Sequence, residues 1–330
     1  MLSIAIIGAG RIGHVHARSV AAHPEARLHV VCDPDEEAAR TLAEQHGSSH
    51  CTDPQAVFDD DRVDAVIIGS PTDLHVPQLL AAATRGKAVL CEKPIAQELR
   101  QVEAVRHDLD RITTPVMFGF NRRFDPSFRA AHDAATAGRL GSVEQLTIIS
   151  RDPSAPPLDY VRRSGGIFRD MTIHDFDMAR HFLGDIVEVQ ATGQVIDPAM
   201  REVDDFDAAV TVLTSRDGAI ATIINNRRCA SGYDQRLEVH GSEGSAWADN
   251  VRANTVRFSD ANATEAQLPY LDFFLERYEL AYANELDAFV QAVLAGTSPM
   301  PGIEDAIAAL ALADAATTSA KEGRPVRLGS

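Results

Sequence analysis

The first 120 residues alternate short, unbroken apolar runs with amphipathic stretches of helical period. Each run is bounded by Gly, Pro or Asp, which is typical of a strand buried on both faces of a parallel sheet. Alternating strands and helices predict right-handed crossovers and a doubly wound sheet. The expected strands are Ser3–Ile7, Leu28–Cys32, Ala65–Gly69, Ala88–Cys91 and Val116–Gly119, and the expected helices lie near Ile12–Ala22, Glu36–Gln45, Val76–Arg85 and Leu99–Leu109.

Beyond residue 120 the pattern indicates an open, mostly antiparallel sheet, with a hairpin turn at Ser215-Arg216-Asp217-Gly218. The expected strands are Val143–Arg151, Val187–Val195, Phe206–Thr214, Ala219–Asn226, Arg236–His240 and Thr255–Phe258. A helix is expected at Phe168–Leu183, and two more close the chain near Phe273–Leu294 and Ile303–Ala320.

These patterns predict an α/β protein of two domains, which suits a length of 330 residues. We expect an N-terminal Rossmann domain, a doubly wound parallel sheet, over residues 1–120. Residues 121–330 are expected to form a C-terminal α/β domain for substrate binding and oligomerisation, with a large open mostly antiparallel sheet. The C-terminal helices could pack back on the first domain.

Charge and composition narrow the possible partners. The formal net charge is −17, from 31 basic and 48 acidic residues, so nucleic acid is not an expected partner. No apolar run reaches the ~20 residues that cross a bilayer, so no membrane association is expected. The apolar run Leu2–Ile7 lacks a basic leader, so we expect no signal peptide and a cytoplasmic protein.

The four cysteines argue against a bound metal. Cys32, Cys51, Cys91 and Cys229 are widely separated and form no CxxC pair, so we expect no structural zinc site and no metal cofactor. The same spacing excludes the design of a zinc alcohol dehydrogenase. Buried, small apolar residues are the simpler explanation for all four.

A glycine-rich motif, Gly8-Ala9-Gly10-Arg11-Ile12-Gly13, follows the first strand and opens a helix. In that context the motif indicates a dinucleotide site, with Gly8 for the tight turn, Gly10 for close approach of the pyrophosphate and Gly13 for helix–strand packing. The phosphates would meet free N–H groups at the helix N-terminus. Arg11 and Ile12 are expected to contact the cofactor as well.

Asp33 indicates which dinucleotide is bound. It ends the second strand twenty residues after Gly13, where a carboxylate accepts hydrogen bonds from the ribose and repels a 2′-phosphate. We therefore expect NAD rather than NADP, although Asp33 could instead begin a helix. Ser70 and Thr72 follow the third long strand and are further candidates for cofactor contacts, with turn formation as the alternative.

Lys93 is the first candidate for catalysis. The chain has three lysines and 28 arginines, so a lysine at the end of a strand, in Cys91-Glu92-Lys93-Pro94, indicates that a compact ammonium is needed there. It could hydrogen-bond a reacting oxygen and stabilise its developing charge. Glu92 and Lys93 are also expected at the cofactor. No tyrosine is followed four residues later by lysine, which excludes a short-chain dehydrogenase design.

The segment from Gly165 to Asp177 carries the second candidate group. If the chain from Asp170 onward is one helix, Asp170 and His174 share a face at i and i+4, and Asp177 lies near them. A carboxylate beside an imidazole fixes its tautomer and raises its basicity, which suits a general base. The two glycines at 165 and 166 would let substrate or cofactor come close. A helix with satisfied surface charges is the alternative.

Arg123 and Tyr233 are weaker candidates for substrate contacts. Arg123 lies just after a strand end, and Tyr233 lies between Gly232 and Asp234. Each could hydrogen-bond a polyol hydroxyl, and each could equally serve packing. His75, after the Ser70–Thr72 loop, is the remaining histidine of interest.

Four motifs, GAGRIG at 8–13, CEKP at 91–94, NRRFD at 121–125 and GGIFRDMTIHDFD at 165–177, resemble the glucose–fructose oxidoreductase/inositol dehydrogenase/rhizopine catabolism (Gfo/Idh/MocA) family. Their order and spacing match over nearly the whole chain, and the last motif is most similar to that of the inositol dehydrogenases. The resemblance implies NAD-dependent oxidation of a secondary hydroxyl of a cyclic polyol, with inositol as the expected substrate.

The resemblance also implies roles for individual residues. Lys93, Asp170 and His174 correspond to the catalytic group, Asp33 to the residue that selects NAD, and Arg123 and Tyr233 to substrate contacts. It further implies a cis peptide before Pro94. A dehydrogenase or reductase of another sugar, or a regulator that binds the dinucleotide without catalysis, remains the alternative function.

Assembly is expected from the second sheet. Several of its strand residues are apolar, and the chain has too few helices to cover both sheet faces. An exposed apolar face of that size usually marks an interface. We therefore expect a homo-oligomer, a dimer or a tetramer, built on one face that carries Val210, Val212, Ile220, Ile223 and Ile224.

Overall fold

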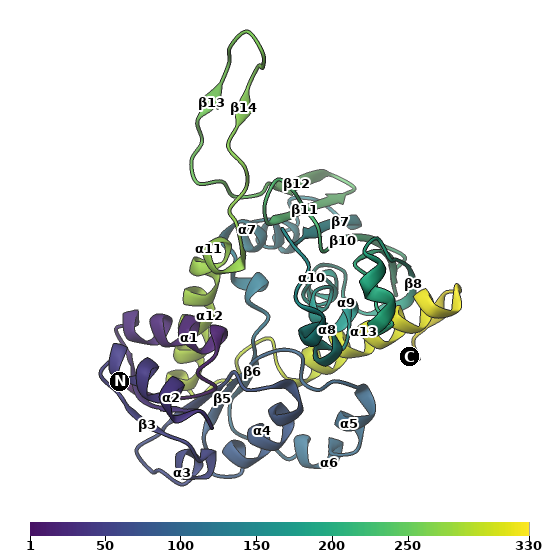
Figure 1. The fold of residues 1–330 in the computed structure, drawn as a ribbon. Coiled ribbons are helices and arrows are strands. Elements are labelled where there is room, and N and C mark those ends of the chain that lie inside the picture. Colours follow the sequence, from purple (N-terminus) through teal and green to yellow (C-terminus); the bar gives the residue numbers. More distant parts are fainter. Residues whose placement is uncertain (330) are drawn as a thin grey trace. The chain divides into compact units, whose positions relative to one another are not determined.

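The computed structural model describes residues 1–329, which divide into two compact units (Figure 1). The first unit contains Met1–Phe124 and Leu280–Ala311. The second contains Asp125–Glu279 and the chain from Leu312 to the end of the described residues. Helix α13 (Ile303–Glu322) contributes residues to both units.

The first unit is built on a six-stranded sheet in the order β3-β2-β1-β4-β5-β6, in which every pair of neighbours is parallel. Its strands are β1 (Leu2–Ile7), β2 (Ala26–Cys32), β3 (Ser49–Cys51), β4 (Ala65–Ile68), β5 (Ala88–Cys91) and β6 (Val116–Phe118). Its other elements are α1 (Arg11–Ala22), α2 (Glu36–Gln45), α3 (Pro54–Phe58), η1 (Thr72–Leu74), α4 (His75–Ala83), α5 (Leu99–Glu103), α6 (Arg106–Leu109), η2 (Asn121–Phe124) and α12 (Glu279–Ala295). This confirms the predicted Rossmann sheet.

The position of β1 in this sheet explains where a ligand would bind. The strand order reverses between β2 and β4, on either side of β1, and ligands of doubly wound sheets bind beyond the carboxyl ends of the strands at such a point. Strands β1, β4 and β5 are buried along their whole length, as their unbroken apolar sequences predicted. Leu286, Phe289 and Val290 of α12 belong to the same buried cluster.

The second unit is built on a seven-stranded sheet in the order β12-β11-β7-β10-β9-β8-β15. Neighbouring strands are antiparallel except β7 and β10, which are parallel. Its strands are β7 (Val143–Arg151), β8 (Ile186–Gln194), β9 (Ala208–Ser215), β10 (Ile220–Asn226), β11 (Asp234–Gly241), β12 (Gly244–Ala248) and β15 (Val326–Arg327). Its other elements are α7 (Pro126–Thr136), α8 (Leu158–Ser164), α9 (Ile167–Asp170), α10 (Ile173–Leu183), η3 (Pro198–Val203), α11 (Phe274–Arg277) and the hairpin strands β13 (Arg257–Phe258) and β14 (Ala266–Gln267).

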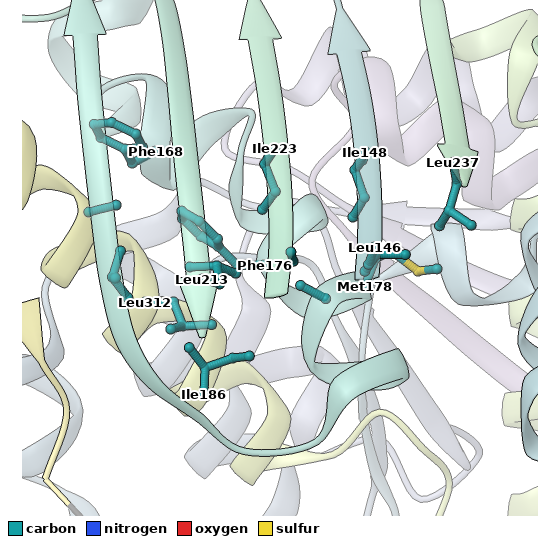
Figure 2. Close-up of a cluster of buried hydrophobic side chains, with 14 of the residues drawn as sticks. Leu146, Ile148, Phe168, Phe176, Met178, Ile186, Leu213, Ile223, Leu237 and Leu312 are labelled. Atoms are coloured by element: carbon teal, nitrogen blue, oxygen red, sulfur yellow. The ribbon is translucent and has the colours of Figure 1, made fainter. Parts of the chain in front are cut away.

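One face of the seven-stranded sheet carries the core of the second unit (Figure 2). Strand residues Leu146, Ile148, Leu213, Ile223 and Leu237 belong to a buried cluster with helical residues. The helical residues of that cluster include Phe168 of α9, Phe176 and Met178 of α10, and Leu312 of α13. The fully buried Ile223 therefore packs against helices, and our prediction that it lies on the interface face is wrong.

The opposite face of this sheet carries partly exposed apolar residues. Val210 is 45% exposed, and it lies beside Ile224, which in turn lies beside Ile149 on β7. Ile220 is also exposed, and β12, at the edge of the sheet, exposes 66% of Trp247. Because side chains alternate between the two faces, Val210, Ile220 and Ile224 lie on the face opposite to that of Ile223.

Three predicted helices are interrupted in the structure. The stretch Leu99–Leu109 forms α5 and α6, and Phe273–Leu294 forms α11 and α12. Phe168–Leu183 forms α9 and α10, because the amide and hydroxyl of Thr172 both reach back to the carbonyl of Ile167, at 3.0 and 3.3 Å. Of the predicted strand Thr255–Phe258, two residues pair, as β13 of the hairpin. The short strand β3 was not predicted.

Two further observations concern membranes and metals. Within residues 1–329, no helix combines the length and the apolar character needed to span a bilayer. In the same part of the chain, no three His, Cys, Asp or Glu side chains are grouped so as to hold a metal ion.

Candidate active site

The glycine-rich turn after β1 has the backbone geometry that a dinucleotide site requires. Gly8 has φ of +105°, a conformation that L-residues with a Cβ rarely adopt. A Cβ at Gly13 would lie 2.0 Å from the carbonyl oxygen of Gly8, so only glycine lets α1 approach the turn. A Cβ at Gly10 would meet no atom within 4 Å, so the backbone there is open to a ligand. These residues fit a bound pyrophosphate at the N-terminus of α1.

Asp33 is fixed beside this turn by two backbone amides. The Ala9 amide donates to Oδ2 at 2.7 Å, and the Asp35 amide donates to Oδ1 at 2.9 Å. Asp35, not Asp33, caps helix α2 by accepting from the amides of Glu37 and Ala38. The carboxylate of Asp33 is therefore held at the end of β2, where the ribose of a dinucleotide would need an acceptor.

The turn after β4 is joined to the residue after Lys93 by a histidine. Nε2 of His75 lies 2.9 Å from the carbonyl oxygen of Ser70, and Nδ1 lies 2.7 Å from that of Pro94. Burial lowers the pKa of the His75 ring, although both carbonyl acceptors favour its protonated form. Ser70 also donates to Gln78, at 2.6 Å, and Thr72 begins η1. His75 is thus a residue of interest, as predicted, and its contact with Pro94 beside Lys93 is seen only in the structure.

Lys93 lies two residues after the end of β5, and its peptide bond to Pro94 is cis, as the family resemblance implied. The other two lysines have structural partners. Lys87 is buried and donates to the carbonyls of Asp60 and Val63, both at 2.8 Å, while Lys321 pairs with Asp204. A compact ammonium is thus needed at Lys87 for structure, so scarcity alone does not identify a catalytic lysine.

Glu92 precedes Lys93 and contacts a buried histidine. Its Oε1 lies 2.9 Å from Nε2 of His16, on α1. Glu285, on α12, is fully buried, and burial together with the charge of Glu92 raises its pKa well above the usual value. Glu92 therefore has an observed structural contact beneath the strand end, and its expected contact with the cofactor remains a prediction.

Both carboxylate oxygens of Asp170 are anchored. The Tyr160 hydroxyl donates to Oδ1 at 2.9 Å, and Nη2 of Arg227 donates to Oδ2 at 3.1 Å. These partners come from α8 and from the residue after β10, respectively. Neither Tyr160 nor Arg227 was identified from the sequence, because each is brought to Asp170 by the fold and no spacing motif connects them.

His174 lies in the first turn of α10, beyond the interruption that follows Asp170. The expectation of one continuous helix from Asp170 onward is therefore wrong, and the i, i+4 argument does not establish that the two side chains pair. Asp177 is buried in the next turn of α10. The catalytic roles of Asp170 and His174 remain predictions that rest on the motif.

The two weaker candidates are both largely buried. Arg123 pairs with Asp305 at 2.9 Å inside the first unit. Tyr233 packs edge-on against Phe273 and Tyr278, with ring centroids 5.9 and 6.0 Å away. The structure thus gives each a packing or ion-pair role, and their contacts with substrate remain predictions.

The structure groups these residues within two units. Gly8, Gly13, Asp33 and Ser70 follow neighbouring strands at the carboxyl edge of the Rossmann sheet, and Lys93 follows the next strand there. The second unit holds a separate set, in which Tyr160, Asp170, Arg227 and Asp205 are connected by hydrogen bonds and ion pairs. His174 and Tyr233 belong to that unit as well.

Family models match most of the chain. Residues 2–120 match an oxidoreductase family model described as an NAD-binding Rossmann fold. Residues 128–247 match the model of the GFO/IDH/MocA C-terminal domain. The two matches follow one another along the chain in the order that the sequence motifs predicted.

Individual relatives match over nearly their full length. An inositol 2-dehydrogenase of Rhizobium meliloti is 46% identical, with 98% of each chain covered. The crystal structure of a myo-inositol dehydrogenase from Corynebacterium glutamicum is 47% identical, with a TM-score of 0.97 and coverage of 100% of this chain and 99% of that one. A scyllo-inositol dehydrogenase from Lactobacillus casei, solved with bound NAD(H) and scyllo-inositol, is 27% identical with a TM-score of 0.91 and full coverage of both chains.

Proposed function

The chain belongs to the GFO/IDH/MocA oxidoreductase family, and from this premise we propose that it oxidises a secondary hydroxyl of a cyclic polyol with NAD, converting myo-inositol to 2-keto-myo-inositol. The observation that carries the proposal is the near-complete match to relatives named as inositol dehydrogenases. The cofactor follows from the Rossmann domain, and the glycine turn with the anchored Asp33 supports NAD.

In this proposal the residues of the chain divide the work as follows. His174 accepts the hydroxyl proton, and Asp170 supports it as a fixed carboxylate. The Lys93 ammonium hydrogen-bonds the oxygen as it becomes a carbonyl. Arg123 and Tyr233 contact the other hydroxyls. When bound, the oxidised nicotinamide takes the hydride from the carbinol carbon, so the substrate loses two electrons and one proton goes to the base.

A turnover assay tests the proposal. The purified protein is incubated with NAD and a panel of inositol isomers and aldoses, and NADH absorbance is followed. We expect the highest kcat/KM for myo-inositol. A protein that binds NAD but forms no NADH with any member of the panel would instead be a sensor of the dinucleotide. A preference for an aldose would move the activity to another sugar.

We also propose that the protein forms a homo-oligomer, a dimer or a tetramer, through the open face of the seven-stranded sheet. The support is the row of partly exposed apolar residues that includes Val210, Ile224 and Ile149. Contiguous apolar surface of this kind usually marks an interface.

A further inference from the structure

Arg227 is a buried cation placed between two carboxylates. Its side chain has no exposed surface, Nη2 donates to Asp170, and Nη1 lies 3.9 Å from Oδ2 of Asp205. Among residues 1–329, Nε and Nη1 of Arg227 have no hydrogen-bond partner. The guanidinium is thus taken out of water with fewer hydrogen bonds than it can donate.

A buried ion pair of this kind contributes little to the free energy of unfolding. Removing two charges from water can cost more than their attraction returns, and an apolar replacement is often at least as stable. What the pair does supply is orientation, because Arg227 holds one oxygen of Asp170 while the Tyr160 hydroxyl holds the other. With both oxygens anchored from different elements, the Asp170 carboxylate cannot rotate freely.

Asp205 competes with Asp170 for the same guanidinium. Its Oδ1 accepts from the Ile167 amide at 3.0 Å, at the start of α9. Burial is the main cause that raises the pKa of Asp205, and the charge of Asp170 adds to it. A Cβ at Gly166 would lie 2.7 Å from Oδ1 of Asp205, so this glycine makes room for Asp205. The sequence predicts room for a substrate or cofactor at the two glycines, and at Gly166 the structure places Asp205 in that space.

We propose that Arg227 is a positioning residue for the oxidation: it holds the Asp170 carboxylate in one orientation, and Asp205 limits how strongly it does so. The inference rests on the proposed function, because it acts through the catalytic role of Asp170. It adds two residues to the site, Arg227 and Asp205, that lie outside the motif at 165–177.

Other charged groups near Asp170 have partners of their own. Arg169, on α9, pairs with Asp314 of α13 at 2.6 Å. On α10, Asp175 accepts from Ser150 at 2.6 Å and from Asn225 at 2.8 Å.

Three further groups complete these surroundings. Asp207 accepts from the amides of Ile196 and Asp197, at 2.6 and 2.7 Å. His174 and Asp177 lie on the first two turns of α10. These groups set the background field, while Arg227 and Tyr160 make the hydrogen bonds to Asp170 on which the test depends.

The test is the pH profile of kcat/KM for myo-inositol with saturating NAD, measured for wild type, Arg227→Met, Arg227→Lys and Asp205→Asn. Losing the cation leaves the Asp170 carboxylate free to stabilise a protonated His174, which makes this base easier to protonate. Arg227→Met should therefore move the acid limb to higher pH and lower kcat about 10–100-fold. Arg227→Lys should restore part of kcat and should move the acid limb part of the way back toward its wild-type position. Asp205→Asn should move the acid limb the opposite way, because it removes the competitor.

A purely structural role predicts something different. It would lower activity at every pH in proportion to the folded fraction, with the acid limb unmoved in all three variants, and that result would overturn the inference. The matched control is Arg277→Met, because Arg277 also forms a buried pair, with Asp125. It should lower thermal stability and leave the acid limb in place. If Arg227→Met does not fold, Arg227→Lys and Asp205→Asn still distinguish the two roles, because they should move the acid limb in opposite directions from its wild-type position.

A second measurement separates this inference from the proposed function. If wild type oxidises no polyol, the proposed function fails. The interaction free energy between Arg227 and Asp170 is then measured by a double-mutant cycle of Arg227→Met and Asp170→Asn, using urea unfolding without substrate. A clear coupling between the two sites supports the anchoring of Asp170, and additive effects overturn it.

Discussion

Nε2 of His16 lies 2.9 Å from Oε1 of Glu92, the residue that directly precedes Lys93. The ring of Tyr282 stands edge-on to His16 at 5.8 Å, and Glu285 is buried one turn further along the same helix, α12. Within the described chain neither carboxyl oxygen of Glu285 has a hydrogen-bond partner. Burial, together with the nearby Glu92 charge, raises the pKa of Glu285 well above its usual value.

This relationship predicts a pH-dependent stability. An unfolded Glu285 loses its proton near the usual pKa of 4.5, whereas the raised pKa of the folded one means that it loses its proton at a higher pH. The folded state then binds more protons, so this group makes the free energy of unfolding fall as pH rises, by up to about 1.4 kcal/mol per unit. Glu285→Gln should remove that slope. Relative to wild type, the free energy of unfolding of the variant, measured with urea, should therefore be more favourable at pH 8 than at pH 5.

The control for this prediction is Glu279→Gln, an exposed position at the start of the same helix. It should leave the slope as it is in wild type. Parallel stability curves for wild type and Glu285→Gln between pH 5 and pH 8 would show that Glu285 ionises normally in the folded protein.

Asp33 predicts the cofactor preference. Its anchored carboxylate accepts ribose hydroxyls and repels a 2′-phosphate, so kcat/KM should be higher with NAD than with NADP. Asp33→Ser should narrow the ratio by about tenfold or more, which corresponds to about 1.4 kcal/mol. Asp64→Ser, at the amino end of β4, should leave the ratio unchanged. Equal use of both cofactors by wild type would refute the assignment.

His174 is predicted to be the general base. His174→Ala should bind NAD as wild type does, measured by calorimetry, and oxidise the polyol about 10²–10⁴-fold more slowly. In wild type the oxidation should rise with pH through the range where a histidine loses its proton, about 6.5 in short peptides. Lys93→Ala should also be slow.

A matched control for His174 lies on the same helix. His181 stacks on His132 with ring centroids 3.6 Å apart, and His181→Ala should keep most of the activity. If His174→Ala folded correctly and retained near wild-type kcat with hydride transfer limiting, the base would have to be another residue, with Lys93 and Asp177 as the next to test.

The open sheet face predicts the assembly state. Light scattering should give a mass of two or four chains, and Val210→Glu should reduce it, because a charge would be placed within the apolar row. Leu294→Glu, at an exposed apolar position on α12, should leave the mass unchanged. A single-chain mass for wild type at working concentration would show that this face is not an interface.

The sequence by itself determined the Rossmann half, because the features that specify it are local. Unbroken apolar runs identify β1, β4 and β5, and the glycine spacing requires the turn that the backbone at Gly8 and Gly13 shows. The hairpin at residues 215–218 was readable for the same reason, since turn chemistry depends on adjacent residues. The motif order also sufficed to identify the family.

Only the tertiary structure decided what surrounds Asp170. Arg227 lies 57 residues beyond it, and no periodicity or spacing relates two side chains whose meeting depends on how β10 pairs with β7 and β9. The same holds for Ile223, whose side of the sheet was assigned wrongly from its neighbours. Local chemistry fixes turns and strands, whereas contacts between distant segments follow from the packing of the whole unit.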